Sequence, residues 1–499
     1  MTTISRRGFL AGSSAVLAAS SLPVGSRAQG DAPLSLAATT RTLDIDGRAA
    51  TVFGLAGPQG EGLILDPGQR FRVDLTNDLD VETIIHWHGQ IPPNVQDGVP
   101  DMPMPKLRPG ETRSYDYAPR PGTHWMHSHV PLQEIRQLAA PLIVRSPEDI
   151  AADRQEVVLF LHDFSFSTPE EVMAEITAGH GTTGHDDHGA MGQGAMPGMA
   201  GSAMAMDPAE MSAMPMDAMP MGGMGGMAMD LNDYDWDAYL ANGRTLSDPE
   251  VVTVERGGRV LLRVINGAAA TVFWIDTGAA PAHLVAVDGH GVVPVAGRRF
   301  GIAMGQRLDI EIALPGEGGA WPILALREGA RDRTGLILAT PGAAIARLGS
   351  LAATEAPAFD TDLAQESRLV TRDPLPARPV ERGHMLMLSG AMQPYVWTID
   401  GRTWANHLPV EARSGERVEL MFHNMSMMGH PMHLHGHAFQ VVEINGRRLS
   451  GARRDTVYVP PMASVTVALD AGEAARWMLH CHHMPHLATG MMTELSVTA

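Results

Sequence analysis

The only cysteine of this 499-residue chain, Cys481, lies within a cluster of histidines. His480 and His482 flank it, and His486 and Met491 follow shortly afterwards. A lone cysteine cannot close an intramolecular disulfide, so it is inert, reactive or a metal ligand. Two imidazoles, a thiolate and a weak axial thioether are the ligand set of a blue-copper electron-transfer site. The composition of this stretch therefore indicates copper.

Four pairs of histidines share the spacing H-x-H. They are His86 and His88, His127 and His129, His433 and His435, and His480 and His482. Residues i and i+2 of a strand point to one face, so each pair can direct two imidazoles into one space. Imidazole nitrogens suit Cu, Zn, Fe and Ni, and eight of them exceed the need of a single ion. The sequence therefore predicts a site with more than one metal.

The strands that must carry these histidines repeat three times. The copies are residues 67–77, 256–266 and 413–424. Each contains an early glycine, has apolar residues at alternate positions and ends in an asparagine, namely Asn77, Asn266 or Asn424. This pattern is typical of a strand with one buried face. Three copies in register predict three β-sandwiches of one type.

The chemistry differs among the three copies. The first H-x-H pair stands at the same offset from the repeat asparagine in copies one and three. In copy two, Ile275 and Thr277 occupy these positions, so the pair is lost. The position of Cys481 is Ser128 in copy one, and only copy three has the additional His430. Domains one and three are thus expected to share a histidine cluster, and domain three to hold the cysteine site.

The charge and the N-terminus limit the partners and the location of the protein. A net charge of −19 argues against a nucleic-acid partner. Arg6 and Arg7 precede a run that is too short and too rich in Ser, Gly and Ala to span a membrane. Residues 1–28 are therefore predicted to be a twin-arginine (Tat) export signal. The product is expected to be a periplasmic monomer without a membrane span.

Residues 179–230 form a methionine-rich segment within the second domain. The segment lacks Val, Ile, Leu and aromatic residues, so it is predicted to be a disordered insertion. Thioethers select Cu(I), which makes the segment a candidate for handling Cu(I), and a low-complexity insertion without a role is the alternative. The candidate Cu(I) ligands are Met214, Met216, Met219, Met221 and Met428.

Taken together, these motifs resemble the multicopper oxidases, specifically the exported bacterial three-domain members of the laccase and copper-resistance type. The resemblance covers about residues 35–499, with all the copper motifs present and in order. It implies an all-β fold of three cupredoxin-like Greek-key β-sandwich domains. These are expected at residues 33–147, 155–345 and 381–499, with a linker at 346–380.

The resemblance also implies ligands for four copper ions. The implied type 1 ligands are His430, Cys481, His486 and, as the axial ligand, Met491. The implied type 2 ligands are His86 and His433. The implied ligands of the type 3 pair are His88, His127, His129, His435, His480 and His482. Electrons from Cu(I) or a phenol would pass through Cys481 to the trinuclear cluster, which reduces O₂ to water.

Protons must also reach this cluster. Asp97 matches the family's acidic residue near the cluster, and we expect it to relay protons; a turn aspartate before Gly98 is the alternative. Many relatives carry a glutamate just before the last type 1 histidine, where this chain has Pro485. For His483 we expect no role beyond a position at the surface or a contact with a substrate.

The identity of the reductant stays open. No carboxylate occurs between Glu419 and Glu443, so a Cu(I) site beside His430 would need an acid from elsewhere in the chain. A laccase that acts on organic substrates only is one alternative. A non-catalytic periplasmic copper-binding protein is another, but such relatives lose copper ligands and this chain retains all of them. One short helix is predicted at 168–178, with Thr168 as its cap.

Overall fold

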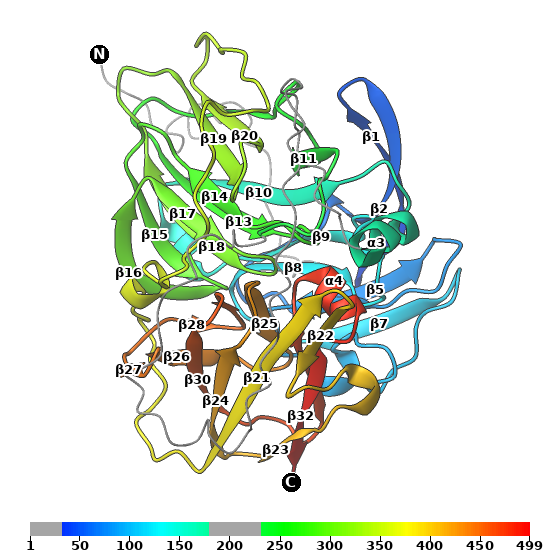
Figure 1. Ribbon diagram of the computed structural model, residues 1–499. Coiled ribbons are helices and arrows are strands. Elements are labelled where there is room, and N and C mark those ends of the chain that lie inside the picture. The colour runs from blue at the N-terminus through cyan, green and yellow to red at the C-terminus, as the bar shows by residue number, and fades with distance from the viewer. Residues whose placement is uncertain (1–31, 179–230) are drawn as a thin grey trace, which may run out of the picture.

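The computed structural model describes residues 32–178 and 231–499. The predicted export signal and the methionine-rich segment lie outside these ranges. The same holds for four of the candidate Cu(I) ligands, Met214, Met216, Met219 and Met221. In the described part the strands form six sheets, arranged as three sandwiches. The prediction of an all-β fold is confirmed (Figure 1).

The first sandwich lies within residues 34–144. Its strands are β1 (Leu34–Ile45), β2 (Arg48–Gly57), β3 (Gly60–Glu61), β4 (Leu63–Leu65), β5 (Phe71–Asn77), β6 (Ile85–His88), β7 (Thr112–Tyr117), β8 (Gly122–Ser128) and β9 (Ala139–Val144). One sheet has the order β3-β2-β1-β5-β7 and the other the order β4-β9-β8-β6.

The second sandwich lies within residues 155–339. Its strands are β10 (Gln155–Phe164), β11 (Ala238–Ala241), β12 (Val251–Thr253), β13 (Arg259–Asn266), β14 (Phe273–Asp276), β15 (Ala282–Val287), β16 (His290–Gly297), β17 (Arg299–Ile302), β18 (Arg307–Ala313), β19 (Ala320–Arg327) and β20 (Arg333–Ala339). The sheets have the orders β11-β10-β13-β18-β15-β16 and β12-β20-β19-β14-β17.

The third sandwich lies within residues 382–498. Its strands are β21 (Arg382–Met392), β22 (Tyr395–Ile399), β23 (Val410–Arg413), β24 (Arg417–Asn424), β25 (His430–Leu434), β26 (Phe439–Ile444), β27 (Arg447–Arg448), β28 (Arg453–Arg454), β29 (Thr456–Val459), β30 (Ser464–Asp470), β31 (Arg476–Cys481) and β32 (Met492–Thr498). One sheet has the order β22-β21-β24-β30-β26-β27, with β28 beside β26, and the other β23-β32-β31-β25-β29.

Helices are short and few in the described ranges. They are α2 (Pro147–Ala151), α3 (Pro169–Ala178), α4 (Met484–Ala488) and the 3₁₀ turns η1 (Asn94–Gln96), η3 (Glu366–Arg368) and η4 (Trp404–Asn406). The predicted helix is α3, and its capping box is present, since the Glu171 backbone N–H donates to Thr168 Oγ1 and the Thr168 N–H to the Glu171 carboxylate. None of these helices is long and apolar enough to cross a membrane.

The three repeat segments form equivalent strands, β5, β13 and β24. Each pairs in parallel with the first long strand of its sandwich, β1, β10 or β21. The repeat asparagines Asn77, Asn266 and Asn424 end these strands and are buried. Each donates from Nδ2 to backbone carbonyls of the loops around it and accepts at Oδ1 from the N–H two residues ahead. The asparagine therefore fixes the turn into the next strand, which carries the histidine pair in the first and third sandwiches.

Candidate metal centres

Each histidine pair is held by a strand of the first or third sandwich. In the first sandwich, β6 carries His86 and His88, and β8 pairs with it so that His86 lies opposite His127. In the third sandwich, β25 and β31 pair so that His433 lies opposite His480. The two domains thus present the same arrangement, as the repeat offsets predicted.

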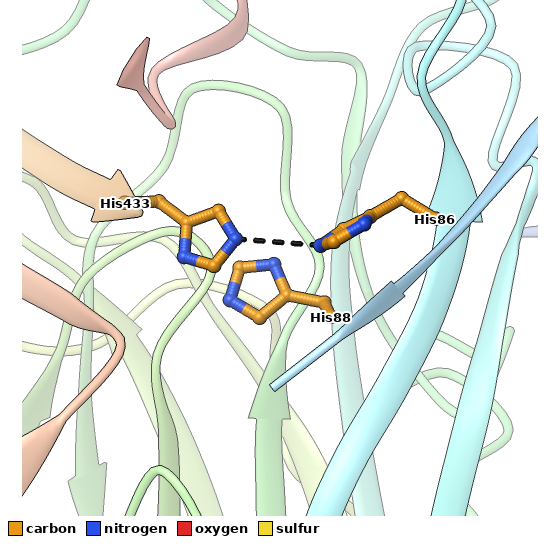
Figure 2. A group of neighbouring side chains, drawn as sticks. All are labelled: His86, His88 and His433. Carbon is orange, nitrogen blue, oxygen red and sulfur yellow. Dashed lines mark hydrogen bonds between the residues drawn. The ribbon is translucent and has the colours of Figure 1, made fainter. Parts of the chain in front are cut away.

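The eight imidazoles of the H-x-H pairs meet between the first and third sandwiches. All are buried, and the most accessible, His129, is 7% exposed. Groups of three have nitrogen atoms within 4.8 Å of one another, and each group mixes the two domains. These groups are His88, His127 and His482; His129, His435 and His480; and His86, His88 and His433. Figure 2 shows the last group, with Nε2 of His86 and His433 3.4 Å apart.

The hydrogen bonds around one pair of rings show that these sites fit a metal ion. The Nδ1 atoms of His435 and His480 lie 2.8 Å from the Asp97 carboxylate and 2.9 Å from the Cys481 carbonyl. Both partners accept, so each ring donates from Nδ1 and keeps a lone pair on Nε2. Those two Nε2 atoms face each other at 3.2 Å. Two lone pairs at this distance repel unless a cation lies beside both, so the donor set fits a metal.

Burial keeps these histidines in the form that binds metals. Burial lowers the pKa of His435 to about 4, and burial together with neighbouring imidazoles lowers the pKa of His127 and His480 well below the usual value. Neutral imidazole is the form that ligates metals. Nε2 of His127 and of His129 has no hydrogen-bond partner among the described residues, which leaves these donor atoms available.

The cysteine site is formed by Cys481 at the end of β31, His430 at the start of β25 and His486 in α4. Nδ1 of His430 and Nδ1 of His486 are 3.1 Å apart, and they lie 3.7 Å and 3.6 Å from Cys481 Sγ. All three residues are fully buried. Met491 is also fully buried, and its backbone carbonyl accepts from the Cys481 N–H at 3.1 Å. Two imidazoles and a thiol with a methionine on the same loop match a blue-copper donor set.

Asp97 connects the two domains at the histidine cluster. Its carboxylate accepts from His435 and its backbone carbonyl accepts from His86 Nδ1 at 2.8 Å. Burial would raise the pKa of Asp97, but His435 and His86 outweigh burial and hold it below its usual range. The turn interpretation also has a basis, because Asp97 follows η1 and Gly98 has a φ of 91°. A role in proton relay stays a prediction.

Two further carboxylates at the cluster, Glu134 and Asp455, were not predicted from the sequence. Glu134 Oε1 lies 2.9 Å from His127 Nδ1, and burial raises the pKa of Glu134 to about 7. Asp455 Oδ1 lies 3.1 Å from His88 Nε2, and the Asp455 carbonyl accepts from His433 Nδ1 at 2.9 Å. Glu134 follows the second histidine pair by only a few residues, and this proximity in the sequence could have identified it. No comparable signal in the sequence points to Asp455.

Of the two expectations for His483, the position at the surface is wrong. His483 is 2% exposed, and its ring stacks on that of His486 with centroids 3.9 Å apart. Helix α4 begins directly after it and turns the ring inward, where Asp233 Oδ2 lies 3.4 Å from His483 Nε2 and 3.5 Å from His486 Nε2. Pro485 lies in the first turn of α4, a position that favours proline. The acid near the cysteine site therefore comes from the second sandwich.

Comparisons with known proteins agree with this geometry. Sequence models of the multicopper oxidase family match residues 39–149, 209–347 and 377–499. The multicopper oxidase MmcO of Mycobacterium tuberculosis is 30% identical over 86% of this chain and 79% of its own. Copper resistance protein A of Escherichia coli is 26% identical over 96% of this chain and 94% of its own. The laccase of Botrytis aclada has a similar fold, with a TM-score of 0.69, 20% identity and coverage of 92% and 86% of the two chains.

The cupredoxin-like sandwiches, the shared histidine cluster and the cysteine site define a copper-dependent oxidase that uses oxygen. The chain belongs to the multicopper oxidase family.

Proposed function

We propose that this multicopper oxidase oxidises Cu(I) in the periplasm and contributes to copper tolerance. Its relatives include copper resistance protein A of Escherichia coli and a homologue from Pseudomonas syringae, which supports such a role. We further propose that the chain is exported by the Tat machinery through Arg6 and Arg7 and acts as a monomer.

We assign type 1 copper to His430, Cys481, His486 and Met491. We assign type 2 copper to His86 and His433. We assign the type 3 pair to His88, His127 and His482 on one side and His129, His435 and His480 on the other. When bound, the copper ions supply one-electron oxidation of the reductant and four-electron reduction of O₂.

Burial of the type 1 ligands supports a small reductant. His430 and His486 are 0% exposed, so no imidazole edge is open to a phenol ring. A cavity of about 10 Å³ lies against His483, which is room for about one water molecule. Met304 and Met428 line this cavity together with the buried carboxyl of Glu328. Two thioethers beside the type 1 site suit Cu(I), and this observation carries the proposal.

The test compares Cu(I) with a phenol. Met428→Leu and Met304→Leu remove the thioethers with little change in volume. We expect each variant to raise the KM for Cu(I) by about tenfold, as loss of a metal-ligand contact does, with the blue colour retained. A wild-type protein that turns over the phenol rapidly and Cu(I) not at all would instead establish an oxidase of organic substrates.

A further inference from the structure

The solvent face of the third sandwich carries exposed methionines. On β21, Met385 is 61% exposed and Met387 is 45% exposed. Single exposed apolar side chains are common and need no explanation. These two are not single, however, because the adjacent strand β24 carries further soft side chains beside them.

Strand register places four of these side chains on one surface. β21 and β24 pair in parallel, with Met385 opposite Met421 and Met387 opposite His423. The intervening residues on both strands, such as Leu386, are buried, so these four point away from the core. We call Met385, Met387, Met421 and His423 the methionine–histidine square. β21 and β24 are labelled in the lower half of Figure 1.

The dimensions of the square suit a shared ion. Neighbouring strands lie about 4.8 Å apart, and residues i and i+2 lie about 6.6 Å apart along a strand. A methionine side chain has three rotatable bonds, so thioethers at these spacings can converge on one point. Thioether and imidazole are soft or intermediate donors, and thioether in particular selects Cu(I).

The charges beside the square also favour a cation. The backbone N–H of Met387 donates to Asp400 Oδ1 at 2.8 Å, which places a carboxylate next to the square. On β24, Glu419 lies two residues before Met421 and is paired with Arg448 of β27.

The soft donors continue from the square to the type 1 site. Met425 directly follows the last residue of β24 and is 51% exposed. Its N–H donates to the Leu388 carbonyl at 2.8 Å. The next residue is Ser426, whose Oγ lies 2.8 Å from His430 Nε2. The chain that follows β24 therefore leads from the square to Ser426, a buried residue in contact with a proposed type 1 ligand.

We propose that the methionine–histidine square binds Cu(I) at the surface and raises its local concentration at the electron entry site. Binding leaves the ion in the cuprous state. The role in supplying Cu(I) rests on the proposed cuprous oxidase function. The binding of Cu(I) to the square does not depend on that function.

Silver(I) tests the binding, because it is a soft monovalent ion that the enzyme cannot oxidise. Copper-loaded, full-length protein labelled with ¹³C at the methionine methyls would be titrated with Ag(I) and followed by NMR. The test variant is Met385→Leu with Met421→Leu. The matched control is Met104→Leu with Met173→Leu, two partly buried methionines of the first and second sandwiches. Retained blue colour and an unchanged Tm report correct folding.

We expect the methyl resonances of Met385, Met387 and Met421 to shift with Ag(I) in the wild type and in the control. In the test variant, the Met387 methyl resonance should need about tenfold more Ag(I) than in the wild type to shift by the same amount. The KM for Cu(I) should rise in the same variant. If the methyl resonances of the square do not shift with Ag(I), or if the test variant binds Ag(I) as tightly as the control, the proposed binding site is wrong. A wild type that binds Ag(I) at the square but oxidises no Cu(I) would instead overturn the proposed function and leave the site standing.

Discussion

The Nε2 atoms of His435 and His480 face each other at 3.2 Å, although each ring donates its other nitrogen to an acceptor. His86 and His433 repeat this arrangement with Nε2 atoms 3.4 Å apart and both Nδ1 atoms on backbone carbonyls. The hydrogen bonds around the cluster thus direct lone pairs inward. The protein prepares its cavity for cations before any cation binds.

Removal of copper is expected to destabilise the protein. Ions that bind the folded state but not the unfolded state add to the free energy of unfolding, by about 4 kcal/mol at a thousandfold excess over Kd. The facing lone pairs of His435 and His480 add repulsion in the copper-depleted protein. Calorimetry of loaded, depleted and reloaded samples measures the effect, and equal Tm values for all three would contradict it.

Glu134 is expected to position His127. Its carboxylate lies 2.9 Å from His127 Nδ1, which also faces the Ser128 carbonyl at 3.0 Å, and partners of this kind fix the orientation of a metal-ligating ring. Glu134→Ala should weaken copper retention by about 10–100-fold. Glu134→Gln retains an acceptor oxygen and should stay close to the wild type. Competition with a copper chelator measures retention, and equal losses in both variants would refute positioning by the acceptor.

Arg307 is expected to stabilise both the fold and the histidine cluster. Its guanidinium binds Asp455 with two hydrogen bonds, of 2.7 Å and 2.5 Å, across the contact between the second and third sandwiches. Both side chains are buried, so Arg307→Met leaves an uncompensated charge that costs about 3–5 kcal/mol. Arg307→Lys should restore little of this stability, because lysine cannot form both hydrogen bonds to the Asp455 carboxylate. Chemical denaturation measures the loss, and a full rescue by lysine would argue against the paired contact.

Glu328 is expected to make stability depend on pH. Burial raises its pKa to about 8, from 4.5 in the unfolded chain. Between these values the unfolded state gives up the proton first, so the stability that Glu328 contributes is lost as the pH rises towards 8. Glu328→Gln cannot ionise, and its advantage over the wild type should grow with pH to on the order of 4 kcal/mol. Denaturation at pH 5 and pH 8.5 tests this, and a constant difference would contradict it.

The sequence revealed the fold because the signals were local and repeated. Alternating apolar residues before Asn77, Asn266 and Asn424 identify equivalent strands without knowledge of their partners. The offset from these asparagines to the H-x-H pairs then indicates which domains face each other. Both signals lie within about a dozen residues of chain, where strand periodicity is informative.

The supporting groups could not be found in this way. Asp455 and His88 are separated by 367 residues, and Asp233 reaches His486 from another sandwich. No periodicity connects such pairs, because their contact depends on how whole domains pack. For His483 the sequence suggested only a position at the surface or a contact with a substrate, whereas α4 turns the ring inward against Asp233.

The most direct test of the proposed function is the amount of O₂ consumed per Cu(I) oxidised by the purified, copper-loaded protein. We expect about four Cu(I) per O₂ without release of peroxide, since each Cu(I) gives one electron and O₂ takes four to become water. Cys481→Ser, which removes the thiolate of the proposed type 1 site, should lose this activity. Two Cu(I) per O₂ with accumulation of peroxide, or no O₂ consumption above the rate of free Cu(I), would contradict the proposal.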